Sequence, residues 1–473
     1  MEFRTLRSEV RGPRSIISQT RSSITLCLLL AASFSGCTAV RHAPIAGDRT
    51  TDLARALNDG RARSAILLIG DGLGDSEITI ARNYQVGAAG RLALDTLPFT
   101  GEYTTYVVQE ANPALPDYVG DSAATATAWA TGHKTSHARL STTPQTDEPL
   151  KTLLELAQEK GLRTGNVTTA ELTDATPAAL NAHINHRNCE GPADMAPCPK
   201  YKKSAGGPGS IAEQTVDHHV DVLLGGGRSR FEQTIDGGPY AGQTVIQSAI
   251  AQGYTVIGLA PALSAMQPGG MLLGLFASGD MGLEWRGEPA KRYPGSGPQR
   301  CVEGVRPPSE PSLAVMTRKA IELLDHDARR GFFLQVEGAA IDKRDHAADP
   351  CGQIGETVAF DAAVQVALEY AATHADTLVV VTGDHAHTSQ IIPAPQPKDH
   401  SPGVFSTLIT ADGANMTLQY ATNLPGRLQA HTGTQIRIAA QGPQAANVVG
   451  VTDQTALFAL IARALSLEAH RAT

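Results

Sequence analysis

The sequence predicts an α/β fold: a large, mostly parallel central sheet with helices on both faces, and a small inserted cap. Three apolar runs, at 65–71, 332–337 and 378–385, are continuous and rich in β-branched or aromatic residues. Such runs are typical of strands that are covered on both faces, as in parallel sheets. Helical periodicity alternates with these runs, and each run ends on an acid. This order of elements is typical of doubly wound domains, in which ligands bind at the carboxyl ends of the strands.

The remaining elements follow from periodicity and from turn residues. Shorter apolar runs predict further strands at 221–224, 254–259 and 271–276. Apolar residues at i, i+3 and i+4 predict helices at 153–157 and 360–371, and Gly161 ends the first of these. The stretch 393–403 is polar and rich in proline, which predicts that about 388–428 forms an insertion or cap.

The first residues have the features of an export leader. Several arginines precede the run ITLCLLLAAS, which is too short to span a bilayer but typical of the apolar region of a signal peptide. The run ends at FSGC, which is similar to the processing box of bacterial lipoproteins, with Cys37 as the lipidated residue; cleavage by an ordinary signal peptidase is the alternative. We expect a leader at 1–37, an N-terminal extension at 38–62 and the main domain at 63–470.

An exported protein enters an oxidising compartment, where cysteines form disulfides. Four cysteines lie beyond the leader, and an even number in an oxidising compartment predicts two disulfides. Of the three arrangements that four cysteines allow, we favour Cys189 with Cys198 and Cys301 with Cys351. Zinc thiolate ligation is the alternative, and the absence of a CxxC spacing argues against it.

The charge balance restricts the partners of the chain. Its formal net charge is −8, so no global basic field exists to hold nucleic acid or an anionic membrane surface. We therefore expect no nucleic-acid-binding surface. An anionic substrate would require local positive charge, from metal ions or single arginines.

Candidate metal ligands gather at the predicted strand ends. Mixtures of histidine and carboxylate suit zinc, and a set with an open coordination position is typical of catalytic sites. The residues of this kind are Asp342 and His346, which are four apart, Asp384 and His385, which are adjacent, and His431. Oxygen ligands suit magnesium, and Asp71, Thr176 and Glu337 could supply them, with Asp71 bridging to a zinc. The alternative for any one of these residues is an ordinary surface or core position.

Ser122 is a candidate nucleophile without a local base. It follows Asp121 directly, opens a predicted helix that ends at Gly132, and has no histidine among the ten residues before it. A hydroxyl is a poor nucleophile near neutral pH, but a zinc ion stabilises its alkoxide as it lowers the pKa of bound water. Zinc can thus replace the missing histidine, while the N–H groups of the helix start favour an anion. A plain capped helix is the alternative.

Longer motifs carry a resemblance to a known family. The stretches LLIGDGLGDSEITIARNY, DSAATATAWATG, TAELTDATPAAL, FFLQVEGAAIDKRDHAADPCGQIGETV, DHAHTSQI and HTGTQIRIAAQGPQAANVVGVTDQT are similar to those of bacterial alkaline phosphatases, from about 65 to 465. The resemblance implies an alkaline phosphatase-like fold and broad hydrolysis of phosphate monoesters. It also implies a homodimer, and together with the leader it implies a periplasmic enzyme. The FSGC box adds a possible membrane tether through lipidated Cys37.

The resemblance also implies roles for individual residues. Ser122 becomes phosphorylated, and the cofactors are two zinc ions and one magnesium ion per chain. One zinc is held by Asp342, His346 and His431, the other by Asp71, Asp384 and His385, and magnesium by Asp71, Thr176 and Glu337, with Asp174 behind it through water. Arg187 binds the phosphoryl group, and Asp121 orients Arg187. Lys343 contacts phosphate through water, and His387 supports a zinc ligand.

Other functions fit the sequence less well. A sulfatase requires a CxPxR motif, which the sequence lacks. A phosphodiesterase of the same superfamily is the nearest alternative, and Glu337 with Thr176 argue against it, because such enzymes generally lack the third metal site. A metal-storing or phosphate-binding protein without turnover would not need Ser122 beside both sets of zinc ligands.

Overall fold

The computed structural model describes residues 48–326, 330–395 and 402–467. All described residues belong to one compact unit of the chain, His42–Thr473. The predicted leader and Cys37 lie outside the described residues, as do parts of the predicted cap (396–401) and the last three residues of the predicted main domain (468–470).

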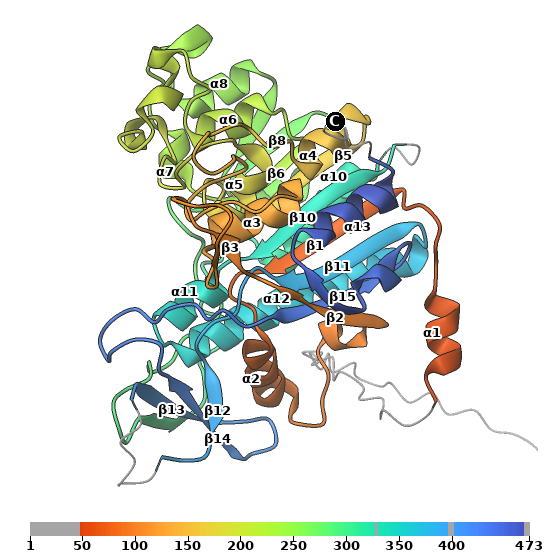
Figure 1. The fold of residues 1–473 in the computed structure, drawn as a ribbon, viewed down its shortest axis with the longest axis vertical. Helices are drawn as coiled ribbons and strands as arrows, with labels where there is room; N and C mark the ends of the chain where they lie inside the picture. Colours follow the sequence, from red (N-terminus) through yellow and green to blue (C-terminus); the bar gives the residue numbers. More distant parts are fainter. Residues whose placement is uncertain (1–47, 327–329, 396–401, 468–473) are drawn as a thin grey trace, which may run out of the picture. The chain divides into compact units, whose positions relative to one another are not determined.

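A ten-stranded sheet forms the centre of this unit (Figure 1). Its strands are β1 (Ser64–Gly70), β2 (Phe99–Thr104), β5 (Arg163–Glu171), β6 (Val222–Gly226), β7 (Tyr254–Ile257), β8 (Met271–Leu275), β10 (Phe332–Gly338), β11 (Thr377–Gly383), β15 (Ile436–Gln441) and β16 (Gly450–Asp453). Their order is β16-β2-β15-β11-β1-β10-β5-β6-β8-β7, and β15 alone among them runs antiparallel to both of its neighbours. The mostly parallel sheet and the six predicted strands are confirmed.

Helices surround the sheet. The α-helices are α1 (Thr50–Ala56), α2 (Asp75–Val86), α3 (Ser122–Thr131), α4 (Leu153–Glu159), α5 (Ala175–Asn181), α6 (Ile211–Asp217), α7 (Arg228–Phe231), α8 (Val245–Ala251), α9 (Ala260–Ala265), α10 (Leu313–Leu324), α11 (Ala340–His346), α12 (Pro350–Thr373) and α13 (Ala456–Leu465). The predicted helix at 360–371 is the second half of α12, which begins earlier, at Pro350 behind the N-cap Asp349.

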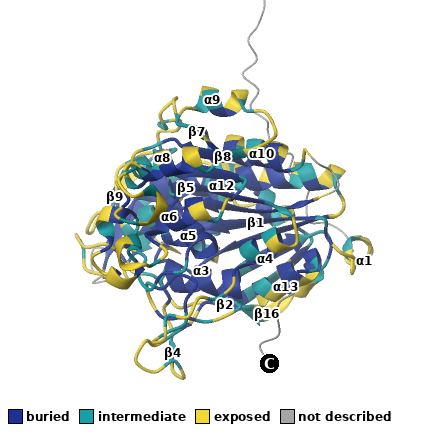
Figure 2. Ribbon diagram, turned by 90° about the horizontal axis from the view of Figure 1, so that it is seen from above, coloured by how far each residue is buried: buried dark blue, intermediate teal, exposed yellow. Residues whose placement is uncertain are grey.

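The two faces of the sheet pack against different helices. Along β1, Leu67 and Ile69 point into a core with α3, α4, α5 and α13, while Ile66 and Leu68 point into a core with α10 and α12. All seven residues of β1 are buried, and Figure 2 shows the buried strands lying between the helices. Burial on both faces explains why these runs are continuously apolar instead of alternating.

Four further strands form a second sheet, separate from the first. Its strands are β9 (Ser296–Gln299), β12 (Gln390–Ile392), β13 (Val404–Ile409) and β14 (Asn415–Tyr420), in the order β12-β14-β13-β9. Three of the four come from the segment predicted as a cap, and β9 comes from a distant part of the chain. A short ribbon of β3 (Val107–Val108) and β4 (Pro116–Asp117) completes the described strands.

Three neighbouring strands place acidic residues at one edge of the central sheet. β1 lies between β10 and β11, with Ile69 opposite Glu337 and Gly70 opposite Gly383. Asp71 directly follows β1, and Asp384 directly follows β11. The carboxyl ends of parallel strands meet at one edge, so these three carboxylates converge there.

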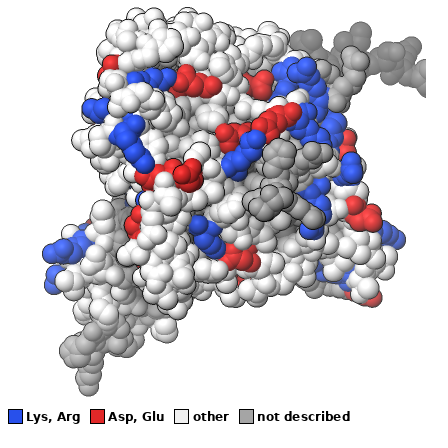
Figure 3. All heavy atoms as spheres, turned by 45° about the horizontal axis from the view of Figure 1, so that its top comes forward, with Lys and Arg blue, Asp and Glu red and all other residues white. Residues whose placement is uncertain are grey.

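The surface is mixed in charge on the face that Figure 3 shows, where Lys and Arg side chains lie among Asp and Glu side chains. Within 48–326, 330–395 and 402–467, no helix combines the length and the apolar character that a bilayer crossing requires.

The predicted disulfide pairing is confirmed: Cys189 is bonded to Cys198, and Cys301 to Cys351. The first pair is separated by 9 residues and the second by 50. The longer loop costs the unfolded chain more entropy when it is closed.

We predict that Cys301→Ser with Cys351→Ser lowers stability more than Cys189→Ser with Cys198→Ser. Loop-closure entropy gives about 4 kcal/mol for the long loop and about 2.5 kcal/mol for the short one. Thermal melting of the two double variants, with equal metal content, measures the difference. A higher melting temperature for the variant that lacks the long-range bond would contradict the prediction.

Candidate active site

Ser122 is the first residue of α3 and is 3% exposed. The N-cap Asp121 accepts a hydrogen bond from Ala124 N–H at 3.2 Å, which fixes the start of the helix. Ser122 Oγ lies 3.4 Å from Asp71 Oδ1 and 3.2 Å from His385 Nε2. The serine therefore faces a group of potential metal ligands.

The first group of such ligands is Asp71, Asp384 and His385, all buried, with one potential ligand atom of each within 4.8 Å of the others. His385 Nε2 lies 3.4 Å from Asp71 Oδ1 and 3.2 Å from Asp384 Oδ2. Gly72 N–H donates to Asp384 Oδ1 at 2.8 Å. Gly72 has φ +69°, and a Cβ there would lie 2.9 Å from Asp342 Cα, so only glycine fits this close turn.

The second group is Asp342, His346, His387 and His431, again within 4.8 Å of one another. The Nδ1 atom of His346 contacts the Gln429 carbonyl, and that of His431 lies 3.0 Å from the Gly120 carbonyl. Because a carbonyl oxygen can only accept a hydrogen bond, each ring carries its hydrogen on Nδ1. The Nε2 atom of the neutral ring therefore has a free lone pair. The two Nε2 atoms are only 3.1 Å apart, and a cation between them would relieve the repulsion of their lone pairs.

His387 has a different role in this group. Thr388 N–H donates to its Nδ1 at 2.9 Å, so the hydrogen of the neutral ring is on Nε2. That atom faces Asp342 Oδ1 at 3.3 Å. An imidazole with its N–H directed at a carboxylate orients that carboxylate and offers no lone pair to a metal.

An oxygen-rich group lies beside Asp71. Glu337 is the penultimate residue of β10, which pairs with β1, and its Oε2 accepts a hydrogen bond from the Thr168 hydroxyl. Thr176 lies in the first turn of α5. Among the described residues, its buried hydroxyl oxygen has no hydrogen-bond partner.

Burial and like charge perturb the carboxyl groups of the site. Burial, followed by the neighbouring carboxylates, raises the pKa of Asp71 well above its usual range, and burial raises the pKa of Glu337 to about 8. Burial opposes ionisation of Asp342 as well, but the surrounding imidazoles outweigh it and hold its pKa well below the usual range. Divalent ions would compensate this buried negative charge.

The donors fit the implied metals. Carboxylate oxygens and imidazole lone pairs in two groups suit zinc, and carboxylates with a threonine hydroxyl suit magnesium. The orphaned hydroxyl oxygen of Thr176 belongs to the oxygen donor set.

Arg187 is held between two carboxylates. Its guanidinium donates to Asp121 Oδ2 at 3.4 Å and to Asp174 Oδ1 at 2.8 Å. Lys343 Nζ donates to Asp174 Oδ2 at 2.8 Å and to Asp280 Oδ1 at 3.1 Å. Because Asp121 precedes Ser122, the arginine is tied to the start of α3.

Some members of the site were not identified from the sequence. Asp280 follows the predicted strand at 271–276, so the rule of an acid beyond a strand end could have found it. The carbonyl groups of Gly120 and Gln429, which set the histidine tautomers, leave no signal in the sequence because every residue has a carbonyl.

The fold and the site define a metal-dependent hydrolase of the α/β class. The sequence profile of one family, Alkaline phosphatase, matches residues 62–424 and 406–467. The chain belongs to the alkaline phosphatase family, whose members hydrolyse phosphate monoesters, and it is an enzyme of that kind.

Individual relatives extend over most of the chain. Streptomycin-6-phosphate phosphatase of Streptomyces griseus is 54% identical over 86% of this chain and 91% of its own length. Alkaline phosphatase of Escherichia coli K12 is 50% identical over 90% of each chain. The solved structure of alkaline phosphatase from the Antarctic bacterium TAB5 has a TM-score of 0.67 at 22% identity, covering 86% of this chain and 100% of that chain.

We predict that chelation with EDTA lowers the melting temperature and that zinc and magnesium restore it. Without cations, buried carboxylates and imidazole lone pairs face one another and destabilise the fold. A ligand present at a thousand times its Kd adds about 4 kcal/mol to the free energy of unfolding. Calorimetry with parallel metal analysis tests this.

Two histidine variants serve as controls for this experiment. His346→Ala should respond less to EDTA than wild type, whereas His133→Ala, an exposed histidine outside both groups, should respond fully. An unchanged melting temperature in wild type stripped of metal would refute the role of the ions.

Proposed function

We propose that the enzyme hydrolyses phosphate monoesters through a phosphoserine at Ser122, with two zinc ions and one magnesium ion per chain. The observation that carries the proposal is the position of Ser122 Oγ, 3.4 Å from Asp71 and 3.2 Å from His385 within a group of metal ligands. When bound, the metal ions lower the pKa of the serine hydroxyl and stabilise charge on the entering and leaving oxygens.

The ligand sets follow from the grouping of donors. Asp342, His346 and His431 would hold one zinc, and His387 would orient Asp342 in that set. Asp71, Asp384 and His385 would hold the other zinc. Asp71, Thr176 and Glu337 would hold magnesium, with Asp174 behind them.

Arg187 would bind the phosphoryl group. A guanidinium presents a planar fork that matches two phosphoryl oxygens, and Asp121 and Asp174 hold that fork in place. Lys343, fixed by Asp174 and Asp280, would contact phosphate through water. The N–H groups at the start of the ten-residue helix α3 favour the same anion.

The reaction has two in-line steps. Ser122 Oγ releases its proton to solvent and attacks phosphorus, the bond to the ester oxygen breaks, and the alcohol leaves with a proton from solvent. Water then attacks the phosphoserine, releases inorganic phosphate and returns the serine hydroxyl. All predicted contacts address the phosphoryl group, which supports broad specificity for the alcohol. Streptomycin 6-phosphate, for which one relative is named, belongs among the test substrates.

The cellular setting is part of the proposal. The two disulfides support export, and a leader at 1–37 would deliver an extension at 38–62 and the main domain at 63–470 to the periplasm. Cys37 would supply a lipid tether. The cap at 388–428 exposes Leu424 and Leu428, which a second copy of the chain could cover in a homodimer.

We predict that Ser122→Ala lowers the rate of p-nitrophenyl phosphate hydrolysis roughly 10³-fold or more, because the attacking oxygen is lost. Acid quenching of wild type should trap phosphate on Ser122, as mass spectrometry can establish. Ser264→Ala, an exposed serine on α9, is the matched control and should keep wild-type rates.

Metal content is measured on the same preparations. Full monoesterase activity in Ser122→Ala would exclude the covalent mechanism. Faster turnover of bis-p-nitrophenyl phosphate than of the monoester would favour the phosphodiesterase alternative.

We predict that Arg187→Lys weakens inhibition by inorganic phosphate about tenfold, since the charge is kept but the fork is lost. Arg187→Ala should weaken it further. Inhibition constants for the three proteins measure both contributions, and equal constants for wild type and Arg187→Lys would show that the fork is not used.

A further inference from the structure

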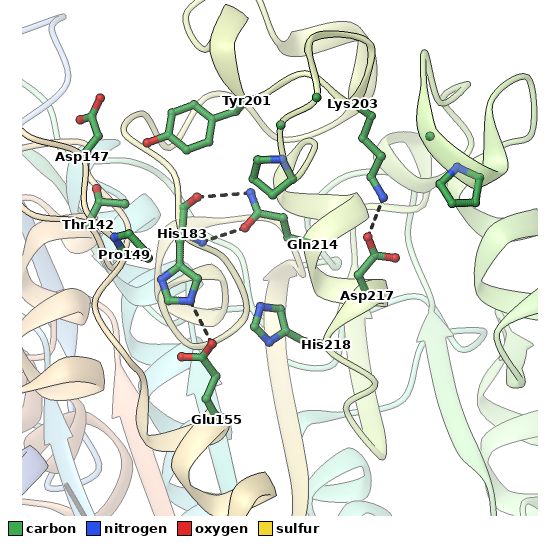
Figure 4. A pocket seen from close by; sticks show the side chains of 15 residues that line it. Thr142, Asp147, Pro149, Glu155, His183, Tyr201, Lys203, Gln214, Asp217 and His218 are labelled. Carbon is green, nitrogen blue, oxygen red and sulfur yellow. Dashed lines mark hydrogen bonds and ion pairs between the residues drawn. The ribbon is translucent and has the colours of Figure 1, made fainter. Parts of the chain in front are cut away.

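A second cluster of metal-binding side chains lines a cavity outside the site described above. The cavity has a volume of about 720 Å³, and none of its lining residues belongs to the catalytic groups (Figure 4). Glu155, His183 and His218 meet there, with one potential ligand atom of each within 4.8 Å of the others. They come from three segments: α4, the stretch after α5, and the end of α6.

The tautomer of His183 leaves a lone pair directed at a carboxylate. Its Nδ1 lies 2.9 Å from the Ser141 carbonyl, which requires the hydrogen on Nδ1. Its Nε2 lies 3.1 Å from Glu155 Oε1. A lone pair and a carboxylate oxygen at this distance repel each other unless a proton or a metal ion lies between them.

The positions of these two side chains are fixed by their neighbours. Glu155 Oε2 accepts Thr152 N–H at 2.8 Å in the capping box of α4. The backbone of His183 is held by the Gln214 side chain, which accepts its N–H at 2.9 Å and donates to its carbonyl at 3.3 Å, as Figure 4 shows. The donors are thus arranged before any ion arrives.

His218 supplies the third donor. It follows α6 directly, and its ring centroid lies 6.0 Å from that of His183. Within the part of the chain that the structure describes, no hydrogen bond or ion pair uses its ring nitrogens. An imidazole without a partner, beside a histidine and a glutamate, is free to bind a metal.

We propose that Glu155, His183 and His218 form a zinc-binding site separate from the catalytic metals. Two imidazoles and one carboxylate are a zinc donor set, and the cavity leaves the fourth position open to water or a small ligand. An ion there would link α4, α6 and the stretch that leads to Arg187, so its binding would stabilise this side of the fold. The proposal does not depend on the phosphoserine mechanism.

The competing arrangement is a simple ion pair between Glu155 and protonated His183. Burial acts to lower the pKa of His183, but the hydrogen bond and the charge of Glu155 outweigh it and raise that pKa. A proton and zinc therefore compete for the same lone pair. His218 distinguishes the two arrangements, because it has no place in the ion pair and is a ligand in the metal site.

Equilibrium dialysis of the zinc- and magnesium-loaded enzyme at pH 8 tests the proposal. At low micromolar free zinc, wild type should hold one zinc per chain more than His218→Ala and Glu155→Gln. The matched control is His219→Ala, which removes the adjacent, exposed histidine and should retain the extra ion. Zinc should raise the melting temperature of wild type and of His219→Ala, but not of His218→Ala.

Hydrolysis of p-nitrophenyl phosphate should be the same in all four proteins, which shows that they are folded and that their catalytic metals are in place. Catalytic ions are common to all of them, so the difference in bound zinc reports the cluster alone. Equal zinc content and equal melting shifts in wild type and His218→Ala would overturn the site and leave the ion pair as the explanation.

Discussion

Repulsion among buried acids and imidazole lone pairs, at one edge of the sheet, is the constraint on which the site depends. Asp71, Asp384 and Glu337 lie together because their strands are neighbours, and burial raises the pKa of each of the three carboxyl groups. Divalent ions would resolve the conflict, since they would replace the missing solvation and attract the same oxygens. The charge that would destabilise an empty site is thus the charge that would attract metal ions.

The surrounding fold arranges this edge for chemistry. Parallel strands bring the acids together, and α3 places Ser122 at its N-terminus against them. Backbone carbonyls of Gly120 and Gln429 set the tautomers of two histidines, and two aspartates hold Arg187. The two histidines and Arg187 therefore each have a neighbouring group that fixes the direction of the side chain, and such support preorganises a site.

Much of the fold was predictable because the signals are local. A strand buried on both faces must be continuously apolar, and Asp121 with Gly132 marks both ends of α3. The strand β9 was not predicted, since its four residues, SGPQ, have no apolar pattern and pair only with the distant β13. The role of Asp280 was missed for a related reason, because its partner Lys343 is remote in sequence.

By itself the sequence determined the types of donor, the acids that end the strands, the capped serine and the family motifs, because these are written in short stretches of chain. Only the tertiary structure decided which lone pairs face each other. Two such groups join residues from different segments: His346 with His431, and His183 with Glu155 and His218. Whether an imidazole nitrogen donates or binds a metal depends on the carbonyl that its other nitrogen meets, and folding alone brings that carbonyl into place.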